Sequence, residues 1–167
     1  QMIQDPTTGV ACYHNLSSSA QFAAIFNNSK GFAKSLKQKP NTSFAFTAAG
    51  HCFSLIGSAI QSGGNVSVLQ FSGNPPLTGA RGLRYASLQG FMVVNSLRKN
   101  LVMMNLSGNA QTVDINSLVK PGSSVVQISG HPNTQVASPQ DVETVRAILT
   151  EKVMLPAYSI TLVTASR

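Results

Sequence analysis

A histidine directly followed by a cysteine stands in the run SFAFTAAGHCFS, residues 43–54. The imidazole of His51 could act as the general base of a Ser-His-Asp triad, provided that the fold brings a serine and an aspartate to it. Whether the chain supplies both partners decides between a hydrolase and another class of protein.

Residues 47–52 are similar to the histidine segment of trypsin-like proteases, except that Gly50 is an additional residue. That family places its triad in the order His, Asp, Ser. Here the nearest candidate serine, Ser62, lacks the preceding Gly-Asp, and the only aspartates after the histidine, Asp114 and Asp141, both follow that serine. The sequence therefore argues against a serine protease, and we assign no catalytic residue.

Cys12 and Cys52 are the only cysteines of the chain. In an oxidising compartment we expect a disulfide between them, which would close a loop of about 40 residues and stabilise the fold by roughly 4 kcal/mol; two buried free thiols are the alternative. The disulfide would bring His14 and His51 together. With reduced cysteines, the same two imidazoles and two sulfurs could instead form a zinc ligand set. Their spacing matches no common zinc pattern, so we predict no metal and no other cofactor.

The composition is typical of a secreted protein rich in β-structure. Only 10% of the residues are charged, so Ser, Thr, Asn, Gln and Gly must cover much of the surface. Asn-x-Ser/Thr triplets mark candidate N-glycosylation sites at Asn15, Asn27, Asn41, Asn65 and Asn105. No apolar run approaches the about 20 residues of a membrane-spanning helix. We therefore expect an extracellular location without a transmembrane segment.

An amphipathic helix is predicted over residues 17–39, because Phe22, Ile25, Phe26 and Leu36 fall on one side of a 3.6-residue period. A neighbouring stripe of this helix carries Lys30, Lys34, Lys37 and, at its end, Lys39. The net charge of +7 favours polyanionic partners, and an acidic polysaccharide fits better than a nucleic acid. Further basic residues that could contribute are Arg81, Arg84, Arg98 and Lys99.

After residue 41, short apolar runs alternate with turn-forming residues. This pattern predicts strands at residues 43–48, 53–60, 66–71, 91–95, 101–106, 111–115, 123–129 and 159–164. Turn signals about 8 to 12 residues apart indicate a sandwich or a barrel. Residues 139–149 instead predict a short helix, because Ser138 and Pro139 form a helix start and apolar residues follow at helical spacing.

The fold class is therefore predicted as all-β, a mainly antiparallel β-sandwich of immunoglobulin-like or Greek-key style with an N-terminal helix. We expect a single domain over residues 1–167, in which the helical segment 1–40 packs on the sandwich 41–167.

The last third of the chain carries the runs LVMMNLSGNAQTVDI, PGSSVVQISGHP and VMLPAYSITLVT. This succession resembles the C-terminal β-sandwich that accompanies the (β/α)8 barrel in retaining glycoside hydrolases, of the heparanase and β-glucuronidase type and of the arabinofuranosidases. The last strand of those families typically reads Leu-Pro-Pro-Tyr-Ser-Ile-Thr, and residues 155–161 depart from it only at Ala157. Those families more often have a strand and a loop where residues 139–149 predict a helix.

The resemblance implies no catalysis in this chain. Retaining glycosidases use two carboxylates about 5 Å apart, and in this clan both lie on strands of the barrel, which is absent here. The carboxylates of this chain are Asp5, Asp114, Asp141, Glu143 and Glu151. Asp141 and Glu143 would point about 200° apart on a helix, so they make no catalytic pair.

Three hypotheses for the function follow. The first is a non-catalytic, secreted β-sandwich glycoprotein with a structural or binding role in an extracellular assembly. The second is the non-catalytic chain of a split or processed glycoside hydrolase, whose partner is a catalytic barrel on another chain. The third is a binder of anionic polysaccharide through the lysine-rich helix. The first hypothesis also allows self-assembly, and direct stacking of sugars is disfavoured because the chain has no Trp.

Overall fold

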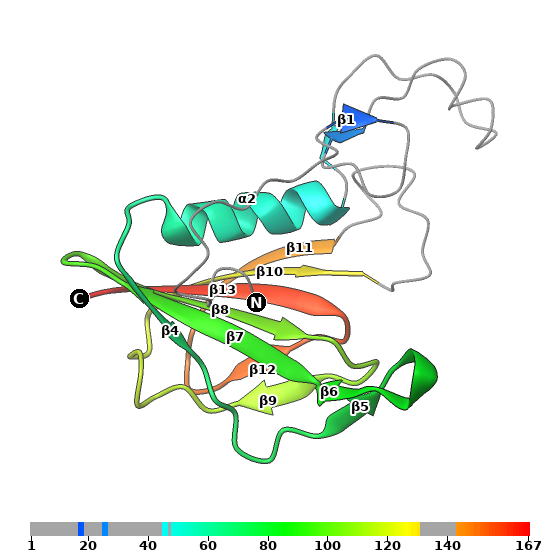
Figure 1. The fold of residues 1–167 in the computed structure, drawn as a ribbon. Coiled ribbons are helices and arrows are strands. Elements are labelled where there is room, and N and C mark those ends of the chain that lie inside the picture. The colour runs from blue at the N-terminus through cyan, green and yellow to red at the C-terminus, as the bar shows by residue number, and fades with distance from the viewer. Residues whose placement is uncertain (1–16, 19–24, 27–44, 47, 131–142) are drawn as a thin grey trace.

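The computed structural model describes residues 17–18, 25–26, 45–46, 48–130 and 143–167. Most of these residues form antiparallel strands joined by short turns, and a helix crosses one face of the largest sheet (Figure 1). The predicted fold class, a mainly antiparallel β-sandwich, is confirmed. Among the described residues, no helix is long and apolar enough to cross a membrane.

Six antiparallel strands form the main sheet, in the order β11-β10-β13-β8-β7-β4. Their bounds are Asn65–Val68 for β4, Leu88–Val94 for β7, Arg98–Asn105 for β8, Ser124–Ser129 for β10, Glu143–Ile148 for β11 and Ser159–Ser166 for β13. Five of them were predicted as strands from the sequence, β11 being the exception. The order places β8 and β13 in the middle of the sheet.

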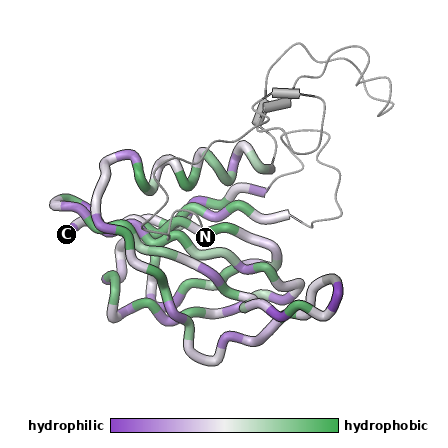
Figure 2. The backbone as a smooth tube through the Cα atoms, viewed as in Figure 1, coloured by the Kyte–Doolittle hydropathy of each residue, from purple (hydrophilic) through white to green (hydrophobic). Residues whose placement is uncertain are grey.

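The two central strands are buried on both faces. Successive side chains of a strand point to opposite faces, so in β8 Leu101 and Met103 join one apolar cluster while Val102 joins another. In β13, Val163 and Leu162 are divided in the same way. All three β8 side chains have no exposed surface. Figure 2 shows apolar residues following the centre of the sheet, which therefore needs a covering layer on each side.

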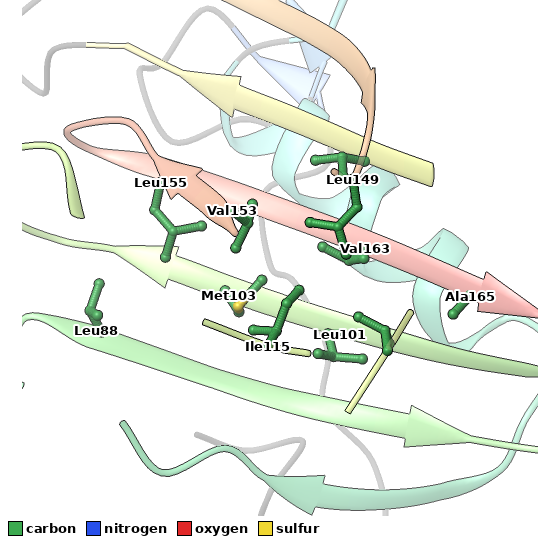
Figure 3. Close-up of a cluster of buried hydrophobic side chains, with 11 residues drawn as sticks. Leu88, Leu101, Met103, Ile115, Leu149, Val153, Leu155, Val163 and Ala165 are labelled. Carbon is green, nitrogen blue, oxygen red and sulfur yellow. The ribbon is translucent and has the colours of Figure 1, made fainter. Parts of the chain in front are cut away.

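A two-stranded ribbon covers the first face. It consists of β9, Gln111–Val113, and β12, Val153–Leu155, which pair antiparallel. Ile115 and Leu149 add apolar contacts from the adjoining loops, and Figure 3 shows them gathered with Met103 and Leu101. This ribbon is the second layer of the sandwich. The sequence predicts β9 within residues 111–115 but not β12.

Helix α2, Ala48–Ile60, covers the opposite face and contacts β8 and β13. Leu55 and Ala59, one helical turn apart, lie in the apolar cluster on this side. The amide Nδ2 of Asn100 donates to the carbonyl of Ala59 at 2.8 Å, which satisfies one of the last carbonyls of the helix.

The strand predicted at residues 53–60 is therefore wrong. A short apolar run fits a strand and a buried helix equally well when it is judged by periodicity. The tertiary structure favours a helix here, because an apolar face of the main sheet would otherwise be exposed to water and the helix buries it. The strand predicted at 43–48 is present as β3, Ala45–Phe46, but Ala48 already begins the helix.

The helix predicted at residues 139–149 is also wrong over its described part. Residues 143–148 form β11, an edge strand that pairs along its whole length with β10, whereas 139–142 lie outside the described residues. Pairing with β10 satisfies the backbone groups of β11 that face the sheet and the outward-facing groups of β10, and this gain outweighs the local helix signal. Strand structure here is what the glycoside hydrolase families would suggest.

A short hairpin of β5, Pro76–Thr78, and β6, Arg84–Ala86, projects from one end of the sandwich (Figure 1). Its tip is the turn η2, Ala80–Gly82, in which Arg81 has a φ of 61° and Gly82 a φ of 73°. The sequence analysis does not predict this hairpin.

Little of the N-terminal segment is described. Within the predicted helix 17–39, Ser17–Ser18 and Ile25–Phe26 are the strands β1 and β2, which pair with each other, and β2 pairs with β3. The remainder of the predicted helix lies outside the described residues. The single-domain arrangement of 1–40 on 41–167 stays a prediction.

Candidate functional site

His51 lies in the first half of α2, at the start of the helix rather than in a strand. Its side chain is half-buried. Within the part of the chain that the structure describes, no group of three or more His, Cys, Asp or Glu side chains could hold a metal. His14 lies outside the described residues. The histidine run is thus the start of the helix that covers the sheet.

Cys52 carries a free thiol in the described part of the structure. It packs against the cluster that also contains Leu55 and Phe91, and burial raises the pKa of its thiol above the ordinary value. A raised pKa keeps the thiol protonated at neutral pH, which makes it a poor nucleophile. Cys12 lies outside the described residues, so the Cys12–Cys52 disulfide stays a prediction.

The described carboxylates are exposed and lie on three different elements. Asp114, directly after β9, accepts a hydrogen bond from the backbone N–H of Asn116 at 3.0 Å and so shapes the following turn. Glu143 begins β11, and the hydroxyl of Ser129 donates to its Oε2 at 3.3 Å. Glu151 lies between β11 and β12. Asp5 and Asp141 lie outside the described residues.

Asn105 is the most highly connected polar side chain at the end of the β8–β13 pair. It is 1% exposed, and its Nδ2 lies 2.8, 3.1 and 2.8 Å from the carbonyls of Asn109, Leu155 and Pro156. Its Oδ1 accepts a hydrogen bond from the backbone N–H of Ser107 at 3.0 Å. We call this set of contacts the asparagine clamp.

The asparagine clamp corrects one predicted glycosylation site. A glycan would have to be attached at the Nδ2 of Asn105, which is buried and already donates to backbone carbonyls, so the folded chain has no room for it. Asn65 is exposed at the start of β4 and stays a predicted site. The triplets at Asn15, Asn27 and Asn41 lie outside the described residues.

The basic residues are distributed over several elements. Lys30, Lys34, Lys37 and Lys39 lie outside the described residues. Arg81 and Arg84 belong to the projecting hairpin, whereas Arg98 and Lys99 begin β8. The structure therefore does not bring all the described candidates into one surface.

Lys99 instead joins two basic residues that the sequence analysis does not single out. Together with Lys120 and Arg167 it lines a hollow of about 470 Å³. The register of the central strands explains this, because Lys99 pairs with Ala165 of β13, and residues 116–123 lie against this end of the pair. The only local signal for the site is the Lys120-Pro121-Gly122 turn, in which Gly122 has a φ of 90°.

Arabinofuranosidases share this fold in solved structures. An arabinose-bound α-L-arabinofuranosidase of glycoside hydrolase family 51 matches over 87% of this chain with a TM-score of 0.52 and 13% identity. A second arabinofuranosidase matches with the same three values. The arabinose complex of the α-L-arabinofuranosidase from Thermotoga maritima matches over 87% of this chain, with a TM-score of 0.52 and 12% identity.

This chain spans only 21%, 32% and 32% of the lengths of those three proteins. At such low identity the likeness concerns the fold alone. It confirms the resemblance to the accessory β-sandwich of glycoside hydrolases, without the catalytic barrel. No protein-family model matches the sequence, and neither does any curated protein.

Proposed function

We propose that this protein is a secreted, non-catalytic β-sandwich with a structural or binding role, of the kind that accompanies a glycoside hydrolase barrel. The observation that carries the proposal is the extent of the fold match: 87% of this chain corresponds to no more than about a third of each arabinofuranosidase. A module of this kind needs a stable scaffold, and a sheet buried on both faces provides one.

The described carboxylates support the non-catalytic part of the proposal. A retaining glycosidase needs one carboxyl group whose pKa is raised so that it can act as an acid, which usually requires an apolar setting. Asp114, Glu143 and Glu151 are all exposed, and the contacts of the first two are a turn hydrogen bond and a serine hydroxyl. These contacts are structural.

A second candidate function is the non-catalytic chain of a split glycoside hydrolase. It is favoured by the fold match, in which this chain corresponds to 21–32% of each arabinofuranosidase; in a split hydrolase a second polypeptide would carry the catalytic barrel. In both candidates the β-sandwich itself performs no hydrolysis.

The test has two parts. The chain 1–167 is assayed for hydrolysis of 4-nitrophenyl α-L-arabinofuranoside, and we expect none above the buffer rate. Hydrolysis that is lost in Glu143→Gln or Asp141→Asn, but kept in the neighbouring control Arg146→Gln, would overturn the non-catalytic assignment.

The native mass of the protein in material from its source then separates the two candidates. A stable complex with a second chain large enough to form a barrel supports the split glycosidase. A glycosylated monomer or a homo-oligomer supports the structural or binding protein.

A further inference from the structure

The hollow beside the ends of β8 and β13 combines an apolar floor with a basic rim. Val119 and Ala165 belong both to its lining and to the apolar cluster on the ribbon side, so the floor is part of the rigid core. Figure 3 shows Ala165 at the edge of this cluster. A volume of about 470 Å³ falls within the range of about 300–1,000 Å³ that is usual for small-molecule sites.

Two of the three basic side chains on the rim are held in place. The ammonium group of Lys99 donates to the carbonyl of Leu118 at 3.1 Å, and the Nη1 of Arg167 donates to the carbonyl of Asn95 at 3.4 Å. An ammonium group has three donors and a guanidinium five, so each retains donors for a ligand. Fixed donors lose less side-chain entropy on binding than mobile ones.

No described Asp or Glu side chain neutralises these charges. Lys99, Lys120 and Arg167 form no ion pair with a described residue. Asp114, the described carboxylate closest in sequence to residues 116–123, is directed to the backbone N–H of Asn116 at 3.0 Å. Three like charges around one hollow repel each other, and an anion placed among them would relieve this repulsion.

The remaining lining mixes polar and apolar residues and contains no aromatic side chain. Ser117 and Ser166 contribute exposed hydroxyl groups, which can donate to or accept from the hydroxyls of a sugar, whereas the hydroxyl of Ser123 is buried and donates to the carbonyl of Lys120 at 2.7 Å. The lining contains no Trp, Tyr or Phe, so recognition cannot depend on stacking of a ring. Charge and hydrogen bonds remain as the means of selection.

We propose that this hollow binds a sulfate or carboxylate group carried by a saccharide, with Lys99, Lys120 and Arg167 as its ligands. The anionic group forms charge-assisted hydrogen bonds with the rim, while the sugar contacts the serine hydroxyls and the apolar floor. The inference goes beyond the proposed function and does not depend on it, because it concerns the sandwich alone.

The experiment uses the chain 1–167 and isothermal titration at low salt with four probes: a sulfated heparin disaccharide, an unsulfated disaccharide that contains glucuronic acid, neutral maltose, and sodium sulfate. We expect at least one acidic disaccharide to bind, and maltose not to bind. The acidic probe that binds identifies whether sulfate or carboxylate is preferred. Sodium sulfate that binds as tightly as the disaccharides would overturn the saccharide part of the proposal.

Variants locate the site. Lys120→Ala and Lys99→Met should each weaken binding by about tenfold, the usual result of losing one hydrogen bond to a charged group. Lys152→Ala is the matched control, because Lys152 is exposed and does not line the hollow. Thermal unfolding confirms that each variant is folded.

Two results would refute the location. Affinity unchanged in both Lys120→Ala and Lys99→Met would show that the hollow is not used. Binding that is lost instead when Lys30, Lys34, Lys37 and Lys39 are replaced together by Gln would place the anion site on the N-terminal segment. Amide shifts confined to residues 116–123 on addition of the disaccharide would support the hollow.

Discussion

The polar groups at the two ends of the β8–β13 pair differ in burial and in hydrogen bonding. At one end, Asn105 is buried, and both its Nδ2 and its Oδ1 have hydrogen-bond partners within the chain. At the other end, Lys99, Lys120 and Arg167 surround an open hollow, and no described Asp or Glu side chain pairs with them. Buried polar groups whose hydrogen bonds are satisfied stabilise a fold, whereas charged groups that form no ion pair keep donors available to a ligand.

This difference predicts opposite consequences for mutation. Substitutions in the asparagine clamp should lower the free energy of unfolding, and substitution of the exposed Lys120 on the rim of the hollow should leave it nearly unchanged. The same strands therefore carry a structural end and an accessible end.

The largest effect is expected for Asn105→Ala. The change removes the donor shared by the carbonyls of Leu155 and Pro156 and the acceptor of the Ser107 N–H, and leaving such buried groups unsatisfied should cost about 3 kcal/mol. Chemical denaturation measures the loss. The exposed Asn65→Ala serves as control, with a change within about 0.5 kcal/mol. A similarly small change for Asn105→Ala would show that the clamp is not structural.

A smaller effect is expected for Gly108→Ala in the loop of the clamp. A Cβ at this position would lie 2.9 Å from the hydroxyl oxygen of Tyr158, so the ring must shift, at a cost of about 1 kcal/mol. The matched control is Gly57→Ala in α2, where a Cβ meets nothing within 4 Å and helix propensity should stabilise the protein by about 0.8 kcal/mol. If both variants changed the free energy of unfolding in the same direction, the tight packing at the asparagine clamp would be contradicted.

The smallest effect is expected for Lys120→Ala at the hollow. Its side chain is exposed and makes no ion pair with a described residue, so the free energy of unfolding should change by less than about 0.5 kcal/mol. The same denaturation experiment tests this. A loss as large as that of Asn105→Ala would mean that Lys120 supports the fold and would remove the contrast between the two ends.

The sequence predicted most of the sandwich because its strands carry strong local signals. In β13, Ser159 to Thr164 read as a strand, and β7, β8 and β10 are apolar runs bounded by turns. The sequence could not distinguish a helix from a strand at 48–60 or at 143–148, because these short segments fit both periods. The first segment forms a helix because it buries the open apolar face of the main sheet, and the second forms a strand because it pairs with β10.

For the functional residues, too, some features could be predicted from the sequence and others only from the tertiary structure. The sequence alone determined the composition, the turn positions, the number of carboxylates and the triplets that could carry glycans. It led us to treat Asn105 as a glycosylation site, since a triplet does not reveal burial. Only the tertiary structure showed that Asn105 forms the asparagine clamp. The register of β8 on β13 placed Lys99 near Arg167, and the packing of residues 116–123 against this end added Lys120. Local structure follows from short-range periodicity and backbone preferences, but a site assembled from distant residues exists only after the strands have paired.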